Sequence, residues 1–427
     1  MRRLRLVLAL AGILLLVSAW VLRIGYLSYV VYVGALVAFV AHLMSSYNLE
    51  GLSTERHCTL RQGHIGDEAV VTVAVRNTRA LFLPWLVLED YLSPGLEVVE
   101  GVLARVAVMK PHGSVGLRYR VRCARRGYHR VGPVLLESGD LFGLTRRFRS
   151  SGEAAFITVY PKILPIDRYS IPTHRPLGET TAQMQIHEDP TRIAGVREYR
   201  HGDPLRRIHW KASAKTGQLH SKIYDPSCLL GANLILDFHA ASWAGDRQVE
   251  RSEFAVSVAA SLASHLASRG VEVGLVCNGV DAADVQEIEP FTIEAANREE
   301  ARERLEARKE TDRLRPIEVP IRRGGESLGL ILDCLARVEL SAGLPLAEMV
   351  AREYNGWPRE HTVVLIVPQL GMELPREIVR LKTTGFSVLV LLIDNPVQAP
   401  RAQVTLAGLN VPMLHLQRDS DLHKIVL

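Results

Sequence analysis

The spacing of apolar residues divides the chain into three stretches with different periods. Two apolar runs without a fixed charge, residues 6–22 and 24–44, open the sequence and are separated by Arg23. From about residue 60 to residue 160, apolar and polar positions alternate with a period of two, and from about residue 233 short apolar runs alternate with amphipathic stretches. The three patterns are typical of membrane-spanning helices, of half-buried strands, and of strands alternating with helices.

The two N-terminal runs predict a transmembrane helical hairpin over residues 1–46. Each run spans or nearly spans a hydrocarbon core of about 30 Å at about 1.5 Å per helical residue. Arginines flank the pair on both outer sides, whereas Arg23 stands alone between the runs; the flanking residues are Arg2, Arg3, Arg5, Arg56 and Arg61. The positive-inside rule therefore predicts a multi-pass protein of the inner (plasma) membrane with its soluble domains in the cytoplasm. A cleaved signal peptide ending near Val17-Ser18-Ala19 is the alternative, and it would leave the second run as an anchor.

The period of two predicts an Ig-like antiparallel β-sandwich over residues 50–160. Apolar β-rich runs at residues 69–75, 85–88, 96–99, 115–121 and 134–137 are separated by turn signals such as Ser93-Pro94-Gly95. We expect about seven strands, the usual number for such a sandwich. Residues 161–190 contain five prolines and little periodicity, which indicates a connector that continues into a basic segment and ends at residue 227.

The C-terminal pattern predicts a doubly wound α/β domain over residues 228–427. Strands are expected at residues 234–236, 271–277, 363–367, 388–393 and near Leu414, and helices at residues 247–268, 295–309, 327–354 and 375–383. Largely apolar strands that alternate with helices indicate a parallel sheet covered on both faces. The fold class is thus multidomain α+β, with a membrane hairpin, a sandwich and an α/β domain.

Positive charge is concentrated in residues 195–224, which we call the basic segment. It holds seven arginines and lysines against two carboxylates, an excess of five that equals the formal net charge of +5 for the whole chain. Asp203 is a good N-cap, Pro204 fits a first helical position and Gly217 suits a helix end, so residues 204–215 are expected to form a short helix. Trp210 and the basic residues then lie on its outer side.

The basic segment has two interpretations. It is either a site for an anion or an acidic partner, which includes nucleotide phosphate, lipid headgroup and protein carboxylates, or a brace between sandwich and α/β domain. In the bracing interpretation Glu198 and Asp203 pair with Arg206 and Arg207. Both interpretations stay open on the sequence.

Motifs for catalysis or nucleotide binding are absent from the sequence. It contains no phosphate-binding loop, no dinucleotide-binding glycine pattern and no metalloprotease or nucleophile-elbow motif. The five cysteines are scattered without a C-x-x-C pair, so neither a disulfide framework nor a zinc site is expected. The sequence therefore predicts a protein that is not an enzyme.

Several short motifs along the chain follow the pattern of one bacterial family. They are Arg126-Gly-Tyr128 with Gly132-Pro133, Ser138-Gly-Asp140 with Phe142-Gly143, Val159-Tyr160-Pro161-Lys162, Arg197 to Asp203, and Ile208-His-Trp210-Lys-Ala-Ser213. The chain resembles, over essentially its whole length, the family catalogued as domain of unknown function 58. That resemblance implies a membrane hairpin, a β-sandwich and a domain similar to von Willebrand factor type A. It also implies a role as adaptor beside an AAA+ ATPase of the MoxR type.

Type A domains hold a magnesium ion with an Asp-x-Ser-x-Ser motif after the first strand, and this chain departs from that motif. Asp237 occupies the aspartate position, but His239 and Ala241 replace the two serines, and Ser242 is one residue out of register. Imidazole is a poor magnesium ligand. Asp237 is the sole candidate ligand, and no cofactor is expected.

The leading hypothesis is a membrane-anchored, cytoplasm-facing adaptor whose partners are the lipid bilayer and a MoxR-type AAA+ ATPase. The predicted partner-binding residues are Arg197, Glu198, Tyr199, Gly202, Asp203, Arg206, Arg207, Trp210, Lys211 and Ser213. The alternative is a protein that binds anionic lipid or nucleic acid through residues 197–222. A hydrolase that uses Asp203, Glu198 or a nearby histidine is a third hypothesis, and it lacks an acid–base pair at the required spacing.

Overall fold

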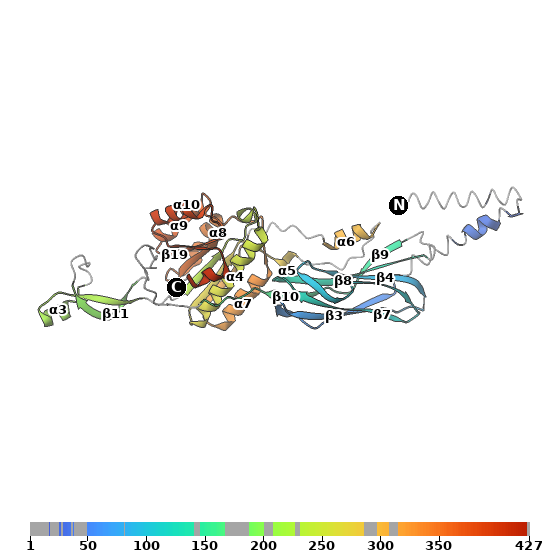
Figure 1. Cartoon of the computed structure of the whole chain (residues 1–427), viewed down its shortest axis with the longest axis horizontal. Coiled ribbons are helices and arrows are strands. Elements are labelled where there is room, and N and C mark those ends of the chain that lie inside the picture. The colour runs from blue at the N-terminus through green and yellow to red at the C-terminus, as the bar shows by residue number, and fades with distance from the viewer. Residues whose placement is uncertain are drawn as a thin grey trace. The chain divides into compact units, whose positions relative to one another are not determined.

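The computed structural model describes residues 17, 25–26, 29–35, 37, 49–80, 82–140, 146–166, 188–199, 208–226, 231–285, 297–306 and 315–424. The chain forms two compact units (Figure 1): Met1–Tyr160 with Ala283–Glu310, and Pro161–Ala282 with Thr311–Leu427. Most of the hairpin predicted for residues 1–46 lies outside the described residues. In the part of the chain that is described, no helix has the length and apolar character needed to cross a membrane. The predicted domain limits stay predictions.

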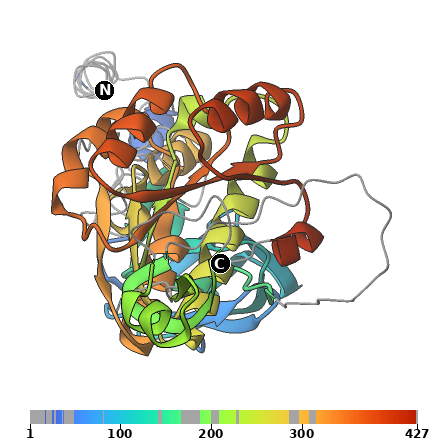
Figure 2. The ribbon, with the colours of Figure 1, turned by 90° about the vertical axis from the view of Figure 1, so that its left-hand side faces the viewer.

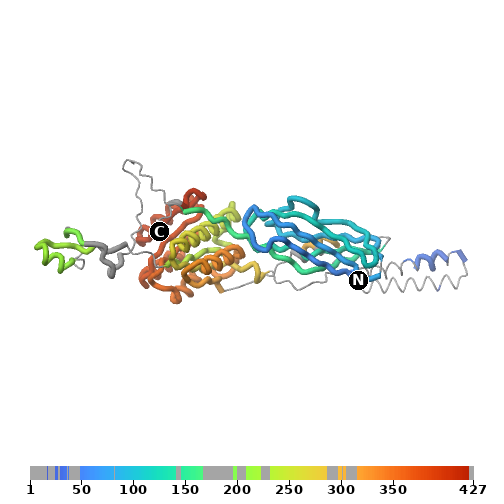
Figure 3. The backbone as a smooth tube through the Cα atoms, turned by 90° about the horizontal axis from the view of Figure 1, so that it is seen from below, coloured from blue at the N-terminus to red at the C-terminus, as the bar shows by residue number. Residues whose placement is uncertain are grey.

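The first unit contains two β-sheets that enclose one hydrophobic core (Figure 3). One sheet has the order β1-β3-β7-β5, with β1 Leu52–Cys58, β3 Glu68–Asn77, β7 Ser114–Cys123 and β5 Leu96–Gly101. The other has the order β2-β10-β8-β4-β6, with β2 Gln62–His64, β10 Ala155–Tyr160, β8 Gly127–Gly139, β4 Leu83–Leu92 and β6 Ala104–Met109. Strand β9, Arg146–Ser151, pairs with β8. All neighbours are antiparallel except β10 and β2.

Alternation along the central strands explains this core. Val71, Val73 and Val75 of β3 are fully buried, whereas the residues between them face outward, and Leu117 and Tyr119 of β7 follow the same rule. The sandwich-like architecture predicted from the period of two is confirmed. The sequence had indicated only five of the ten strands by position, because β1 and β9 are rich in polar residues and β2 has three residues.

The second unit is built on a six-stranded sheet of order β16-β14-β13-β18-β19-β20. The strands are β16 Ile317–Arg322, β14 Glu272–Cys277, β13 Gly231–Leu236, β18 Thr362–Val367, β19 Ser387–Ile393 and β20 Met413–Leu416. All pairs are parallel except β14 and β16. The chain runs outward from β13 to β14 and β16, and then returns to the other side of β13 with β18, β19 and β20. This is a doubly wound topology whose direction reverses between β13 and β18.

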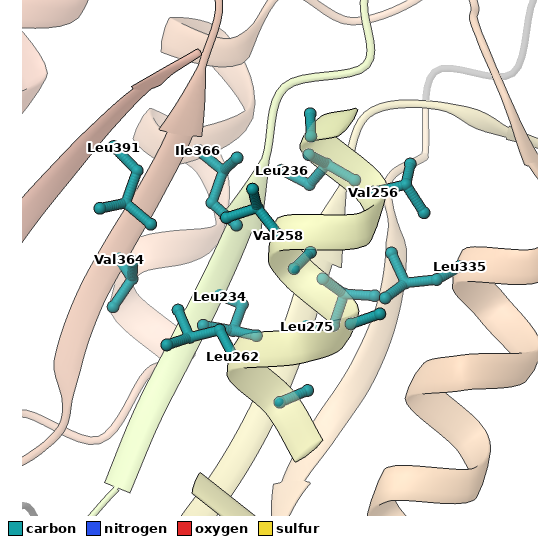
Figure 4. Packing of buried hydrophobic residues seen from close by; sticks show 14 of the residues in the cluster. Leu234, Leu236, Val256, Val258, Leu262, Leu275, Leu335, Val364, Ile366 and Leu391 are labelled. Carbon is teal, nitrogen blue, oxygen red and sulfur yellow. The ribbon is translucent and has the colours of Figure 1, made fainter. Parts of the chain in front are cut away.

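Helices cover both faces of this sheet (Figure 2). On one face α4 (Gln248–Ser268) and α7 (Gly325–Arg337) pack on Leu234, Leu236, Val364, Ile366 and Leu391, as Figure 4 shows. On the other face α8 (Leu346–Glu353), α9 (Leu374–Thr383) and α10 (Ala399–Gly408) pack on the alternate residues of the same strands. Because each central strand is buried on both faces, its sequence is largely apolar, with Asn233 of β13 as a buried polar residue.

Two predictions for this unit were wrong in detail. The sheet is mixed, since β16 runs antiparallel at its edge and was not predicted; its Pro320 lacks an N–H and is tolerated at an edge. The helix expected over residues 327–354 is two helices, α7 and α8, because β17 (Val338–Glu339) lies between them and pairs with β15 (Val280–Asp281). The unit also contains 3-10 helices at Ala240–Trp243, Tyr354–Gly356 and Asp419–Lys424, and the short helix α5 (Ala282–Val285) begins at its boundary with the first unit.

A separate two-stranded sheet carries part of the basic segment. Strand β11 (Glu188–Glu198) pairs antiparallel with β12 (His220–Pro226), and helix α3 (Trp210–Thr216) lies between them in sequence. We call β11, α3 and β12 together the arm. Helix α6 (Arg298–Glu306) belongs to the first unit, although it lies in sequence between strands of the second.

Candidate functional site

The arm is stabilised by hydrogen bonds between the start of α3 and strand β12. His209 is the N-cap of α3: its Nδ1 accepts from the backbone N–H of Ala212 at 3.0 Å, and its own N–H donates to the carbonyl of His220 at 2.8 Å. Ile208 is buried and forms an isolated bridge with Ser221. The residues just before α3 therefore belong to the small sheet and not to the helix.

Ser213 connects the helix to the strand with one hydroxyl group. Its Oγ donates to the carbonyl of His209 at 3.1 Å and accepts from the backbone N–H of His220 at 2.9 Å. The helix then ends at Gly217, whose φ of 74° is left-handed and favours glycine. Ser213 is buried and holds α3 in place, and the partner-binding role predicted for it stays a prediction.

The residues between these anchors point outward. Trp210 is 69% exposed, and Lys211 and Lys215 are exposed beside it. Leu219 and Val196 add exposed apolar surface. Across the described residues, no carboxylate pairs with Lys211 or Lys215. The arm thus presents the ring of Trp210 and two lysines on a helix that hydrogen bonds to β12 hold in place.

The predicted partner-binding residues fall into two groups. Arg197, Glu198, Trp210, Lys211 and Ser213 lie in the arm, and Tyr199 directly follows β11, where its N–H donates to the carbonyl of Leu219 at 2.9 Å. Gly202, Asp203, Arg206 and Arg207 lie outside the described residues, so the predicted ion pairs with Arg206 and Arg207 do as well. The predicted helix start at residue 204 is wrong for residues 208–209, which are in a bridge and an N-cap, whereas its end at Gly217 is confirmed.

A second candidate site lies at the carboxyl ends of the parallel strands. The sheet reverses its winding direction between β13 and β18, and open α/β sheets bind ligands in the crevice at such a point. Asp237 directly follows β13, and its backbone N–H donates to the carbonyl of Ile366 on β18 at 3.0 Å. The predicted position of Asp237 at the end of the first strand of this sheet agrees with the structure.

The carboxyl group of Asp237 is enclosed by hydrogen-bond donors of the protein. Its Oδ1 accepts from Nδ2 of Asn278 at 3.0 Å and from the backbone N–H of His239 at 3.2 Å, and the Ser242 hydroxyl also bonds to it. The residue is 2% exposed. Burial raises the pKa of Asp237 above its ordinary value, although the hydrogen bonds from Asn278, Ser242 and His239 act in the opposite direction.

This donor set does not fit a magnesium ion. Mg²⁺ requires near-octahedral oxygen ligands, and a ligating carboxylate has to be ionised. Here a single carboxyl group with a raised pKa is already occupied by an amide, a hydroxyl and a backbone N–H. No cluster of three or more His, Cys, Asp or Glu residues suited to a metal occurs within the described ranges.

Asn278 was missed by the sequence analysis. It follows β14 directly, so its place at the same sheet edge as Asp237 could have been inferred from strand order. Its Oδ1 accepts from the Phe238 N–H at 2.5 Å, and its Nδ2 also donates to the carbonyl of Leu344 at 3.0 Å. Asn278 is thus the centre of a buried hydrogen-bond network that connects β13, β14 and the loop before α8.

Other polar contacts at this edge are nearer the surface. Arg247 forms an ion pair with Asp394 at 2.8 Å, and both residues have positive φ angles, 56° and 37°. Asn395 donates from Nδ2 to the carbonyl of Pro368 at 2.7 Å. These contacts join the loops after β18 and β19 to the start of α4, and they give the edge a polar rim.

These features define a class of protein: a multidomain α+β chain in which β-sandwich-like sheets precede a mixed, mostly parallel α/β sheet, with an exposed basic arm inserted before that sheet.

Residues 195–291 match the family described as "Protein of unknown function DUF58" and form a domain of that family. The match covers the described C-terminal part of β11, then α3, β12, β13 and α4, and it includes Asp237 and Asn278. The resemblance to family 58 is confirmed for these residues.

The chain is also similar to a bacterial protein of unknown role. It is 27% identical over 265 residues to the "Uncharacterized protein YeaD" of Bacillus subtilis strain 168. The alignment covers 61% of this chain and 62% of that protein, so the match spans less than two thirds of the relative's length.

Similarities to solved structures are slight. The cupredoxin domain of amoB from Nitrosocaldus yellowstonii is 12% identical, with 31% of this chain and 97% of that chain covered and a TM-score of 0.21. The alpha-2-macroglobulin of Escherichia coli is 19% identical, with 26% of this chain and 7% of that chain covered and a TM-score of 0.21. Scores of this size carry no functional argument.

Proposed function

We propose that this protein is an interaction protein that docks an acidic partner protein through its arm. The observation that carries the proposal is the exposure of Trp210 at 69%, beside Lys211 and Lys215, on a helix fixed by buried Ile208 and Ser213. Tryptophan is enriched among the residues that dominate binding energy at protein interfaces. Lysines around it attract a negatively charged partner and raise the association rate.

The family resemblance suggests which partner this is. It implies a MoxR-type AAA+ ATPase, and the apolar N-terminal runs support an adaptor anchored in the inner membrane with its soluble units in the cytoplasm. The second unit is proposed to be a von Willebrand type A-like domain. Its doubly wound sheet and the place of Asp237 after the first strand support that proposal. No catalytic step is proposed, because the buried carboxyl group of Asp237 is held by hydrogen bonds inside the protein.

Binding of an anionic lipid surface or of nucleic acid is the second candidate. Trp210 with adjacent lysines favours it as well, since tryptophan partitions to membrane interfaces and stacks on bases. Phosphate-driven binding weakens steeply with added salt. A protein interface anchored by a buried tryptophan depends less on salt, so the two candidates differ in a measurable way.

The test is affinity purification of the full chain in detergent, with bound proteins identified by mass spectrometry. Trp210→Ala and Lys211→Glu/Lys215→Glu are expected to lose an ATPase of the MoxR type that the unchanged protein retains. Met372→Ala and Arg401→Glu are the matched controls, since both residues are exposed on the second unit away from the arm in sequence. Retention of the same partner by all variants would contradict the proposal. Binding of the unchanged protein to phosphatidylglycerol vesicles or single-stranded DNA, lost in the arm variants, would favour the second candidate.

A further inference from the structure

Helix α6 is held on the sandwich by ion pairs to two glutamates. Arg298 lies with Nε 3.3 Å from Oε2 of Glu89 and with Nη2 3.2 Å from Oε2 of Glu137. Arg302, one helical turn later, pairs with Oε1 of Glu89. The two arginines are four residues apart and therefore lie on the same side of α6.

Both glutamates lie on the outer face of the second sheet. In β4 and β8, Glu89 pairs with Leu135, and Glu137 pairs with Val87. Their neighbours Leu88 and Leu136 point into the core of the sandwich, so Glu89 and Glu137 point away from it. Their side chains are nevertheless only 14% and 7% exposed. Carboxylates this poorly solvated require a positive partner.

The helix itself brings charge but little apolar surface. Its sequence, REEARERLE, has one large apolar residue, Leu305. The contact is also imperfect, because Nε of Arg298 and Oε2 of Glu89 are both buried without a hydrogen-bond partner in the described part of the chain, despite their ion pair. The arginines in these ion pairs are partly exposed and therefore screened by salt, so α6 leaves its site more readily than a core helix does.

The two glutamates differ in the cations that stay paired with them when α6 leaves. Glu137 keeps Arg146, whose Nη1 lies 3.5 Å from its Oε1. The cations that the structure pairs with Glu89 are both on α6. Glu89 would then be left without a cation among the described residues and available to another positive group.

We propose that Glu89 and Glu137 form a receptor site for an arginine-bearing helix, occupied by α6 of the same chain and open to α6 of a second copy of this chain when its own α6 leaves. The site selects two arginines four residues apart, since one arginine reaches both glutamates and the next strengthens the contact with Glu89. The site is on the sandwich and is independent of the arm.

The test measures binding of a fluorescein-labelled peptide of residues 296–308 to the full chain in detergent, by fluorescence anisotropy. Three proteins are compared: the unchanged chain; Arg298→Gln/Arg302→Gln, which frees the site; and the same variant with Glu89→Gln/Glu137→Gln, which removes its charge. Because α6 competes at the high effective concentration of a tethered segment, freeing the site is expected to tighten peptide binding at least about tenfold. Removing the glutamates is expected to abolish that gain, and raising NaCl from about 50 to about 500 mM is expected to weaken the binding.

Two controls separate the proposal from loss of folding. A peptide with glutamine in place of both arginines is expected not to bind the freed site, and circular dichroism establishes that each variant is folded. Hydrogen exchange of α6 in a Glu89→Gln/Glu137→Gln chain is expected to be faster than in the unchanged chain. Equal peptide affinity for all three proteins, no binding to a folded chain with the freed site, or unchanged exchange of α6 would each overturn the proposal.

Discussion

A buried charge in the sandwich core depends on a single arginine. Asp90 is fully buried, and its carboxylate pairs with Arg56 and accepts from the Tyr119 hydroxyl at 2.7 Å. Burial raises the pKa of Asp90, and the guanidinium of Arg56 opposes that rise. Burial and the adjacent Asp90 also raise the pKa of Tyr119, so its hydroxyl stays a donor. The buried carboxylate of Asp90 is therefore stabilised by the cation of Arg56 and by the hydroxyl of Tyr119.

Replacing Arg56 by methionine leaves Asp90 buried without its cation. The free energy of unfolding of the sandwich is expected to fall by about 3–5 kcal/mol, the usual cost of breaking a buried ion pair from one side. Urea unfolding of the full chain in detergent measures it. The control is Arg120→Met, whose ion pairs with Glu68 and Glu100 are exposed, and where less than about 1 kcal/mol is expected. Equal losses in the two variants would show that the Arg56 pair does not support the core.

The raised pKa of Asp237 makes the second unit sensitive to pH. The folded state holds this proton more tightly than the unfolded chain, in which the pKa is close to 3.8. The stability that the proton on Asp237 gives the folded state is therefore complete below the ordinary pKa, and it is lost as the pH rises through the raised folded-state pKa. The stability difference between the unchanged protein and Asp237→Asn is expected to vary with pH in this direction, as measured by urea unfolding at a series of pH values. A difference that does not vary with pH would mean that Asp237 titrates normally.

At the scale of single elements, some residues of the arm stabilise its fold, whereas others are proposed to bind a partner. Ser213→Ala removes one hydrogen bond to the N-cap residue His209 and one that joins α3 to β12. The local stability of α3 is expected to fall by about 1–3 kcal/mol, because the backbone N–H of His220 loses its acceptor. Hydrogen exchange of the α3 amides measures this loss. Ala214→Ser, at an exposed neighbouring position, is the control, and equal exchange in both variants would count against the role given to Ser213.

The same elements show how far the sequence predicts the fold. Largely apolar strands were placed well, β18 and β19 to within one residue at each end, because burial on both faces leaves an apolar run. The start of β13 was placed three residues late, because Asn233 interrupts its apolar run. β16 was missed because it alternates, contains Pro320 and lies at an edge. The start of α3 was misplaced because Pro204 after Asp203 is a standard helix signal, whereas pairing of Ile208 with Ser221 depends on a strand twelve residues later.

The sequence identified some residues of the candidate sites and missed others, because it does not reveal contacts between residues far apart in the chain. Charge density identified the basic segment, and the resemblance to type A domains identified Asp237. The network of Asp237 with Asn278 joins residues 41 apart in sequence, and the contact of Arg302 with Glu89 joins residues 213 apart. Arg298 and Arg302 were predicted only to lie in a helix over residues 295–309, because local spacing gives no information about such partners.

At the scale of the whole molecule, two compact units whose described residues share no hydrophobic core predict two unfolding events. The sandwich has one core, and the α/β sheet has a core on each of its faces. Arg56→Met is expected to lower the midpoint of one thermal transition. Leu236→Ala, in the core beneath α4, is expected to lower the other by removing about 2–5 kcal/mol. Calorimetry of the two variants tests this, and a single transition shifted equally by both would show that the units unfold together.

The exposure of Trp210 gives the protein an internal optical reporter. Among the tryptophans in the described part of the chain, Trp243 and Trp357 are buried and Trp85 is partly buried. An indole in water emits at longer wavelengths than a buried one and is accessible to iodide. Iodide therefore quenches the fluorescence of Trp210 more than that of the other tryptophans in this group. A partner that covers the arm would shield Trp210 from iodide. The arrival of a partner at the arm can then be followed in the unlabelled protein by the loss of quenching alone.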